Sequence, residues 1–470
     1  MADASRDTSR ETGAPFPTLR AWLRHLAATG RVAEIAPNVG LRFELAAIAK
    51  KLEGKQAMLF PSPDGHPLPV VSGVLAARAW MAEAMGVPPG ELLARFRRAA
   101  DAPLAWHEVP RAEAPCQEVI VNDIDLAGLL PLPTHNELDA GPYITAGLVI
   151  ARNPATGRQN VSINRLQLQS PDRLGILILP RDLNRFYTAA EEKGEALPVS
   201  IVIGVDPLTL LASQAIAPLD ADELEIAGAL HGRALRVVKS IRGDIRVPAD
   251  SEIVIEGRIL PKVRAPEGPF GEFPQYYGPK GERQVIEITA VTHRQKPLFH
   301  TIVPGGLEHL LLGGIPREAT ILSYLQRNFP NVQDVHLAPG GVCRYHLYVK
   351  LKKRQPAEAA NVIMAAFSSH YDVKHVIVVD HDVDIHDPRQ VEWAVATRFQ
   401  ADKDLLVIPA AQGSRLDPSA TDGISAKMGL DATLPLNPGP EFTVIRVPGE
   451  DELDLAKVVR GNLSPGYFGK

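Results

Sequence analysis

Between residues 116 and 294 the sequence is a series of short apolar runs separated by glycine, proline and aspartate. The runs are QEVIVNDID, ITAGLVIARNP, VSINRLQLQSPD, LGILILP, VSIVIGVDP, LRVVKS, SEIVIEGRIL and QVIEITAVTHR. Short runs rich in valine and isoleucine favour strands, and their regular spacing is typical of a β-barrel or a strongly bent sheet. We therefore predict that this part of the chain forms a β-barrel or a strongly bent sheet.

The regions on either side of these runs mix helical and strand patterns. Before residue 110, helices are predicted over residues 19–29 and 41–52 and in VPPGELLARFRRAA. After the sheet, REATILSYLQRNF, a segment from about residue 356 to 369 and a segment after Asp387-Pro388 read as helices that alternate with strands such as HVIVVD. This alternation is typical of a layered α/β domain.

Composition limits the class of protein and its compartment. A chain of 470 residues exceeds what one hydrophobic core normally serves, and a net charge of −5 without basic clusters argues against nucleic-acid binding. Cys116 and Cys343 are far apart and lack a metal-binding spacing, which argues against a disulfide framework or a thiolate metal site and favours a reducing cytoplasm. The polar N-terminus lacks the apolar core of a signal peptide, and the most apolar run is broken by Asp206-Pro207.

The segment EGPFGE places Glu267 and Glu272 on a stretch whose glycines and Pro269 forbid a regular helix. A tight loop of this kind would hold both carboxylates from a rigid base. Two acids held close together separate in pKa unless a cation offsets them, which suits acid–base chemistry. The alternative, that both glutamates are solvated on a hairpin loop, remains open from this motif alone.

The segment NVSINR contains a second pair of polar residues in a strand-like run. Alternation along a strand would place Asn160 and Arg165 on opposite faces unless the strand bends or ends between them. An asparagine oxygen can bind a hard cation, and an arginine can bind a carboxylate or phosphate through two parallel hydrogen bonds. A barrel-end asparagine and a surface arginine are the structural alternative.

Other motifs favour structural interpretations. The acidic segment HDVDIHD (residues 381–387) follows a strand and ends in an Asp-Pro pair suited to capping the next helix, so we predict no metal site there. The glycine pairs of PGGLEHLLLGG, which we expect to form a loop, match neither a Rossmann nor a P-loop pattern. The sequence also has no GxSxG elbow.

Seven segments occur in one order along the chain: NVSINR, LPVSIVIGVDP, DADELEIAGALHG, EGPFGE, PGGLEHLLLGGIPREA, VIVVDHDVDIHDPRQVEWAVATR and KMGLDAT. This succession resembles the UbiD-like decarboxylases, which use prenylated FMN for reversible decarboxylation of aromatic, heteroaromatic or α,β-unsaturated acids. The resemblance implies an α/β (α+β) fold with a split β-barrel of flavin-binding type. The expected parts are a disordered tail (1–18), an N-terminal α/β unit (19–115), the barrel cofactor domain (116–305) and a C-terminal α/β oligomerisation domain (306–470).

The resemblance also implies roles for individual residues. Arg165, Glu267 and Glu272 match the catalytic network, with Glu272 expected as the proton donor. A divalent Mn²⁺ or Mg²⁺ is expected on Asn160, Asp182 and Glu223, where Asp182 occupies the place of a histidine in better-known relatives. The remaining matches are, for potassium, Val161, Ser213, Ala215 and Glu223; for the flavin, Asn160, Ser162, Ile163, Asn164, Arg165, Leu179, Arg181, Glu223 and Lys427; and for the substrate, His309 and Leu310.

The same resemblance predicts partners: a small carboxylic acid substrate, a UbiX-like flavin prenyltransferase that supplies the cofactor, and a second copy of the chain in a homodimer or homohexamer. No membrane span and no nucleic acid are expected. The alternatives are a non-catalytic flavin- or metal-binding subunit, and a flavin enzyme of this fold that works mainly as a carboxylase.

Overall fold

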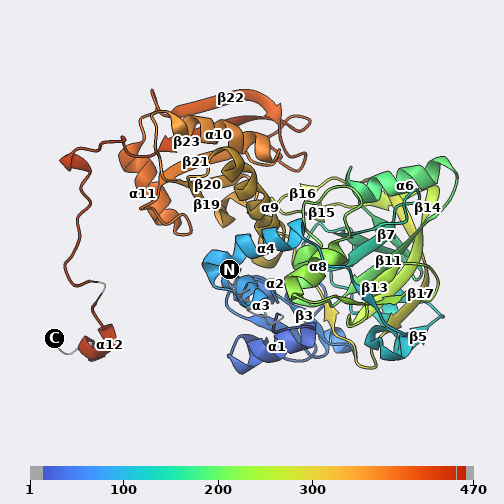
Figure 1. The fold of residues 1–470 in the computed structure, drawn as a ribbon. Coiled ribbons are helices and arrows are strands. Elements are labelled where there is room, and N and C mark those ends of the chain that lie inside the picture. Colours follow the sequence, from blue (N-terminus) through green and yellow to red (C-terminus); the bar gives the residue numbers. More distant parts are fainter. Residues whose placement is uncertain (1–13, 451, 462–470) are drawn as a thin grey trace, which may run out of the picture.

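The computed structural model describes residues 14–450 and 452–461 of the chain, so most of the predicted tail lies outside the described residues. The fold is mixed α/β, which confirms the predicted class (Figure 1). Across the described ranges, no helix is both long and apolar enough to cross a membrane. Cys116 and Cys343 are buried and unpaired, as expected for a chain without disulfides.

The N-terminal unit is a four-stranded sheet with helices packed against it. Its strands are ordered β1 (Val32–Glu34), β2 (Ala57–Phe60), β3 (Val70–Ser72) and β18 (Phe299–His300). Its helices are α1 (Leu19–Ala28), α2 (Glu44–Leu52), α3 (Arg78–Met85) and α4 (Leu92–Asp101). The helix predicted from residue 41 begins later because Phe43 has a positive φ of 73°, which interrupts helical geometry.

The central region is one large sheet with strand order β6-β9-β10-β17-β14-β11-β7-β8, and β5 pairs with β17. Its strands are β5 (Val119–Val121), β6 (Tyr143–Ile144), β7 (Leu148–Arg152), β8 (Gln159–Ile163), β9 (Leu166–Ser170), β10 (Arg173–Ile176), β11 (Leu197–Ile203), β14 (Ile253–Glu267) and β17 (Gly281–His293). Two register shifts bend the long β14–β17 pair, the first beside Gly257. Within the described residues the sheet is bent and open, not a closed barrel.

Smaller elements surround this sheet. The helices are α5 (Leu126–Leu129), α6 (Asp182–Glu192), α7 (Pro207–Ala212) and α8 (Glu223–His231). The short strands are β4 (His107–Glu108), β12 (Arg236–Lys239) and β13 (Arg246–Pro248) in one small sheet, and β15 (Phe270–Gly271) and β16 (Tyr277–Gly278) in another. Thus the EGPFGE segment follows the end of β14 and contains β15.

Helix α9 (Leu307–Asn328) joins the two halves of the molecule, and it corrects the prediction that PGGLEHLLLGG is a loop. The helix runs through Gly313, Gly314 and Pro316 because burial on several sides outweighs their low helix propensity. It packs against α4 and α7 and also against the strand β19 and helix α10 of the C-terminal region. Figure 1 shows this helix at the junction between the central sheet and the C-terminal domain.

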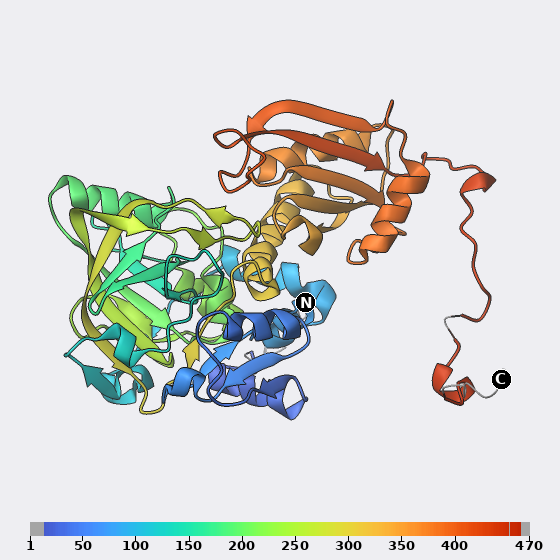
Figure 2. The same ribbon diagram turned by 180° about the vertical axis from the view of Figure 1, so that it is seen from behind.

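The C-terminal domain is a five-stranded sheet between helices. The strand order is β19 (Val332–Leu337), β20 (His346–Leu351), β21 (His375–Asp380), β23 (Ile424–Ala432) and β22 (Leu405–Gln412). Helices α10 (Glu358–Ser369) and α11 (Pro388–Arg398) form where the sequence predicted them, and the side chain of Asp387 caps α11 as expected. Beyond β23 the chain leaves the domain and ends in the short helix α12 (Leu455–Val458) (Figure 2).

Candidate active site

Arg165 lies where one strand ends and the next begins. Strand β8 stops at Ile163 and β9 starts at Leu166, so the alternation that would separate Asn160 and Arg165 is interrupted between them. The turn is held by its own side chains, because Ser162 Oγ donates to Asn164 Oδ1 at 2.9 Å and Asn164 Nδ2 donates to Leu177 O at 3.2 Å. Arg165 is thereby directed away from the strand pairing and towards the EGPFGE segment.

The guanidinium of Arg165 binds both glutamates of EGPFGE. Its Nε and Nη2 donate to the two carboxylate oxygens of Glu267 at 2.9 and 2.7 Å, and its Nη1 donates to Glu272 Oε1. Glu267 is 0% exposed. The interpretation of two solvated loop glutamates is therefore wrong, and the three predicted residues form one buried cluster.

The loop between the glutamates is held from several directions. Tyr143 donates from its hydroxyl to Glu267 Oε1 at 3.3 Å, and Gln167 Oε1 accepts from the backbone N–H of Gly268 at 3.1 Å. Asp139 Oδ1 accepts from the N–H of Gly271 at 2.8 Å. Gly268 has φ of +83°, which an L side chain rarely adopts. These supports give the carboxylates little freedom to move.

The two carboxylates share one cation, Arg165, but they bind it differently. Burial raises the pKa of the Glu272 carboxyl above its ordinary value, Arg165 opposes this shift, and the nearby Glu267 charge adds to it. Glu267 meanwhile accepts both parallel bonds from Arg165, the strongest geometry for a carboxylate. Glu272 is therefore the member of the pair suited to carry and release a proton.

A cavity of about 690 Å³ opens beside this cluster, between the central sheet and the C-terminal domain. Its size is within the range of cofactor and substrate pockets. Arg165 and Glu272 line it together with the apolar side chains of Phe270, Phe273 and Ile302. The cavity also reaches predicted flavin residues, which are Ile163, Asn164, Leu179 and Arg181.

The predicted substrate residue His309 lines the cavity and is neutral. Its Nδ1 accepts from the N–H of Gly305 at 3.1 Å, which leaves the proton on Nε2. Burial, assisted by the charges of Arg344 and Arg317, lowers the pKa of His309 to about 3. His309 can thus donate one hydrogen bond from Nε2 without carrying a charge.

Two arginines with little exposure, Arg317 and Arg344, line the same cavity, and the sequence analysis missed both. Burial and the charge of Arg344 lower the pKa of Arg317 to about 9, and burial also lowers the pKa of Arg344. One carboxylate lies near them: Asp372 Oδ2 is 3.9 Å from Arg317 Nη2. Gly313 makes room for them, since a Cβ there would collide with Arg344. The only signal in the sequence was that each arginine follows a glycine pair by three residues: Gly313-Gly314 before Arg317, and Gly340-Gly341 before Arg344.

A second cluster of predicted residues gathers around Glu223 at the start of α8. Asn160 Nδ2 donates to Glu223 Oε1 at 3.0 Å, and the N–H of Val161 donates to Oε2 at 2.7 Å. Burial raises the pKa of Glu223 to about 8, with smaller contributions from the charges of Asp222 and Asp182. A buried carboxylate beside a second acid, with no basic side chain bonded to it among the described residues, suits a bound cation.

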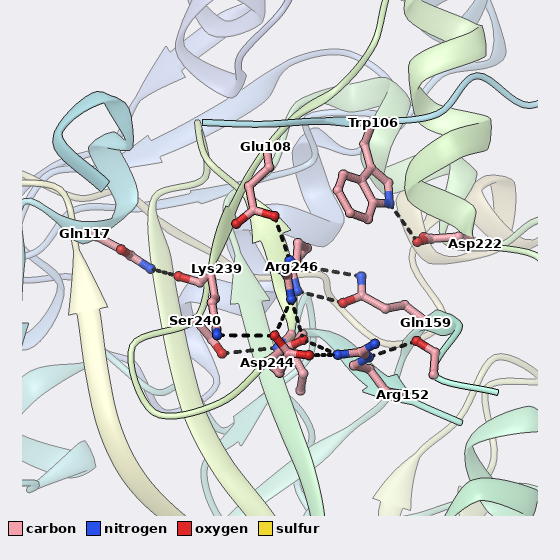
Figure 3. A network of polar contacts seen from close by, with 12 residues as sticks. Trp106, Glu108, Gln117, Arg152, Gln159, Asp222, Lys239, Ser240, Asp244 and Arg246 are labelled. Carbon is pink, nitrogen blue, oxygen red and sulfur yellow. Dashed lines mark hydrogen bonds and ion pairs between the residues drawn. The ribbon is translucent and has the colours of Figure 1, made fainter. Parts of the chain in front are cut away.

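A polar network holds the neighbours of this cluster in place (Figure 3). Gln159 bonds the backbone N–H and C=O of Arg246 at 2.6 and 3.1 Å, and Trp106 donates to Asp222 Oδ2 at 3.1 Å. Gln159 precedes Asn160 and Asp222 precedes Glu223 in the chain. The network therefore fixes the backbone on both sides of the candidate cation site.

Several predicted residues lie outside the cavity. Lys427 is buried and donates to the carbonyls of Tyr371 and Val373, at 2.9 and 2.5 Å. Leu310 packs into the core and does not line the cavity. Ser213 ends α7, where its Oγ donates to Leu210 O, and α7 packs against α8. Ser162 and Ala215 are likewise absent from the cavity wall.

Comparison with known proteins assigns residues 23–432 to one family, apart from two short gaps. Three parts match the N-terminal, Rift-related and C-terminal domains of 3-octaprenyl-4-hydroxybenzoate carboxy-lyase (UbiD), at residues 23–100, 107–307 and 310–432. An anhydromevalonate phosphate decarboxylase from Methanothermobacter thermautotrophicus is 38% identical over 87% of this chain and 95% of its own.

Solved structures of UbiD-class enzymes are similar to this chain over most of its length. HmfF, a UbiD-class enzyme from Pelotomaculum thermopropionicum solved with FMN, has 50% identity and a TM-score of 0.93, covering 94% of this chain and 100% of its own. An evolved dimeric form of HmfF, solved with prFMN, has 48% identity and a TM-score of 0.89 with the same coverage.

Proposed function

Because the chain belongs to the UbiD family of carboxy-lyases, we propose that it catalyses reversible, non-oxidative decarboxylation of an aromatic, heteroaromatic or α,β-unsaturated acid with prenylated FMN. The observation that carries this proposal is the buried cluster of Arg165, Glu267 and Glu272 on the wall of a cavity of about 690 Å³. A subunit that only bound flavin would have no use for a protonatable carboxyl held in this way.

The residues of the cluster have distinct roles. Loss of carbon dioxide leaves negative charge on a carbon atom, and prenylated FMN supplies the electron sink that no side chain provides. Glu272 donates a proton to the carbon that has lost its carboxylate. Arg165 holds Glu272 in place, and Glu267 holds Arg165 through both of its carboxylate oxygens.

The reaction is tested directly with the cofactor-loaded protein. The chain is produced together with a UbiX-like flavin prenyltransferase, and its absorption spectrum is compared with that of protein made without the transferase. An altered flavin spectrum and release of carbon dioxide from a panel of unsaturated and aromatic acids are expected. The same preparation with bicarbonate measures carboxylation. A loaded protein that acts in neither direction on any acid would favour the non-catalytic alternative.

We propose that the substrate carries a second acidic group, because the cavity has excess positive charge on part of its wall. Arg344 is buried there and Arg317 is largely buried, and a single nearby carboxylate, Asp372, offsets the two of them. Buried charges of one sign are costly unless an opposite charge joins them, and guanidinium groups bind carboxylates and phosphates well. The relative named anhydromevalonate phosphate decarboxylase acts on a compound that carries a phosphate.

This prediction is tested with Arg317→Met. We expect kcat/KM to fall by about 100-fold for an acid with a second carboxylate or phosphate, since loss of one partner of a buried charge pair costs about 2–5 kcal/mol. Steady-state kinetics on matched mono- and diacids measure the difference. Arg327→Met, an exposed arginine on the same helix, is the control. Equal losses on mono- and diacids would contradict a second acidic group.

The proposal includes a divalent cation, Mn²⁺ or Mg²⁺, on Asn160, Asp182 and Glu223, and potassium close to it on Val161, Ser213, Ala215 and Glu223. Oxygen donors of these types suit hard cations. The buried, uncompensated Glu223 carboxylate supports the assignment. Asp182 adds a second negative charge in place of the family's histidine. These cations would hold the cofactor phosphate, with Lys427 nearby in the predicted arrangement.

Metal content tests the cation site without reference to activity. We expect cofactor-loaded protein to contain about one Mn²⁺ or Mg²⁺ per chain by elemental mass spectrometry, and Glu223→Gln to lose most of it, because metal ligands must be ionised. Glu225→Gln removes a carboxylate from the same helix that pairs with Arg158, and it should leave the metal content unchanged. Wild-type protein without a divalent ion would refute the site.

A further inference from the structure

Thr145 is a polar side chain on the cavity wall that takes no part in the proton transfer by Glu272. It directly follows β6, whose Ile144 pairs with Leu166 at the start of β9. Thr145 and Arg165 are the next residues beyond this pair on their two strands, and both line the cavity. Thr145 therefore lies beside the residue that holds Glu272.

A chain of hydrogen bonds runs inward from Thr145 to a buried histidine. Thr145 Oγ1 lies 3.0 Å from Thr301 Oγ1, and Thr301 Oγ1 lies 2.9 Å from His135 Nε2. Thr145 Oγ1 also accepts from the backbone N–H of Ile302 at 3.0 Å. Thr301 and His135 are both buried, so Thr145 is the one side chain of the three that lines the cavity.

The protonation of His135 gives this chain of bonds a direction. Burial lowers the pKa of His135 to about 3, so the ring is neutral and carries one N–H. Its Nδ1 has no hydrogen-bond partner among the described residues. Native structures leave a buried N–H unpaired more rarely than a buried acceptor. The proton is therefore assigned to Nε2, which donates to Thr301 Oγ1.

Each hydroxyl has one hydrogen, so the direction set at His135 passes along the chain of bonds. Thr301 accepts from His135 and donates to Thr145 Oγ1. Thr145 Oγ1 accepts this bond and the bond from Ile302, and it has no further partner among the described residues, so its own hydrogen is free for an acceptor in the cavity. With the proton on Nδ1 of His135, both hydroxyls would donate inward, and Thr145 would offer the cavity only an acceptor.

We propose that His135 is a positioning residue that acts through Thr301 and makes Thr145 a hydrogen-bond donor to the ligands of this cavity. The acceptor is a ring oxygen or nitrogen of the flavin, or a carboxylate oxygen of the acid, and the identity of both ligands rests on the proposed function. Thr145 shares the cavity with Ile163 and Asn164, two of the predicted flavin residues. A donor whose direction is fixed before binding needs no reorientation when the ligand arrives.

Titration of flavin-free, full-length protein with FMN measures the donor without reference to activity. Thr145→Val keeps the shape of the side chain but removes the hydroxyl, so the dissociation constant for FMN should rise about 2- to 12-fold, which is what one hydrogen bond contributes. Thr145→Ser keeps the hydroxyl and should bind FMN as wild type does. Thr292→Val removes a buried hydroxyl of β17 that has no partner among the described residues and lies outside the cavity, so FMN binding should not change.

Steady-state kinetics of the cofactor-loaded protein distinguish the two acceptors. If the acceptor is on the substrate, Thr145→Val leaves FMN binding unchanged but raises KM for the acid about 2- to 12-fold, with kcat within about twofold. A Thr145→Val protein that binds both FMN and the acid as wild type does would overturn the proposal. Protein that binds FMN but releases no carbon dioxide would contradict the proposed function alone, and the FMN titration then decides this inference by itself.

A double-mutant cycle tests the role of His135, and its readout is whichever quantity Thr145→Val changes. His135→Leu removes the N–H that orients Thr301, so ligand binding should weaken about 2- to 5-fold. His135→Gln, whose amide can donate from the position of Nε2, should restore most of it, and His135→Asn, whose amide takes the position of Nδ1, should not. In protein that already carries Thr145→Val, His135→Leu should weaken binding no further, because the donor that it orients is gone. Equal losses in the two backgrounds would indicate a structural role only and would overturn the positioning role.

Discussion

Replacing Glu272 with glutamine is expected to lower kcat for decarboxylation by about 100- to 10,000-fold, the range that a positioned general acid contributes. Glutamine keeps the size of the side chain and can still accept a bond from Arg165, but it has no proton to donate. The flavin spectrum of the loaded variant should match that of wild type. Measurement is by carbon dioxide release under saturating substrate.

The control for this substitution is Glu282→Gln, which changes an exposed glutamate on the neighbouring strand β17 and should leave kcat within about twofold. The pH profile gives an independent check. Because burial raises the pKa of Glu272 above its ordinary value, the protonated, active form persists at higher pH and is lost as pH rises through that pKa. Wild type should show this falling limb, and full turnover by Glu272→Gln would contradict the assignment of the proton donor.

Replacing Arg165 with methionine is expected to destabilise the protein by about 3–5 kcal/mol as well as to abolish activity. The substitution leaves Glu267, which is fully buried, without the cation that binds both of its oxygens. An uncompensated buried carboxylate is far more costly than the loss of a surface ion pair. Denaturant unfolding of the two proteins measures the difference.

A second substitution separates the charge from the packing in this defect. Removing the carboxylate charge of Glu267 should offset the loss of Arg165, because a neutral buried polar group costs far less than an unpaired buried charge. Arg165→Met with Glu267→Gln should recover much of the stability. Arg258→Met, in the half-exposed pair with Glu287, should cost about 0–1 kcal/mol.

Local patterns predicted the elements well where neighbours in sequence are also neighbours in space. The apolar runs of β11 and β14, the periodicity of α10 and the Asp387 cap of α11 are properties of short segments. Helix α9 could not be predicted from its local pattern, because its glycines and Pro316 argue against a helix. Packing against α4, α7 and β19 stabilises the helix instead. The pairing of β18 with β3 could not be predicted from the sequence either, since 227 residues separate Phe299 from Ser72, the last residue of β3.

The cluster of Arg165, Glu267 and Glu272 could be predicted because its three residues occur in recognisable motifs in a fixed order. Arg317 and Arg344 could not, because nothing near them in sequence reports that both become buried on one cavity wall. Burial of a charged side chain depends on what packs around it from distant segments. In the sequence, Arg317 and Arg344 could therefore not be distinguished from the many exposed arginines.

The sequence by itself determined the α/β class and a central barrel or strongly bent sheet, because these depend on residue types and spacings within short segments. The order of its motifs, through the family resemblance, also identified the arginine and the two glutamates. Tertiary structure alone decided which carboxylate is bound on both oxygens, how a turn at Arg165 closes the cluster, and which distant arginines share its cavity. The physical reason is that protonation and charge compensation depend on burial and on the groups that converge there, and both are set by contacts between segments far apart in the chain.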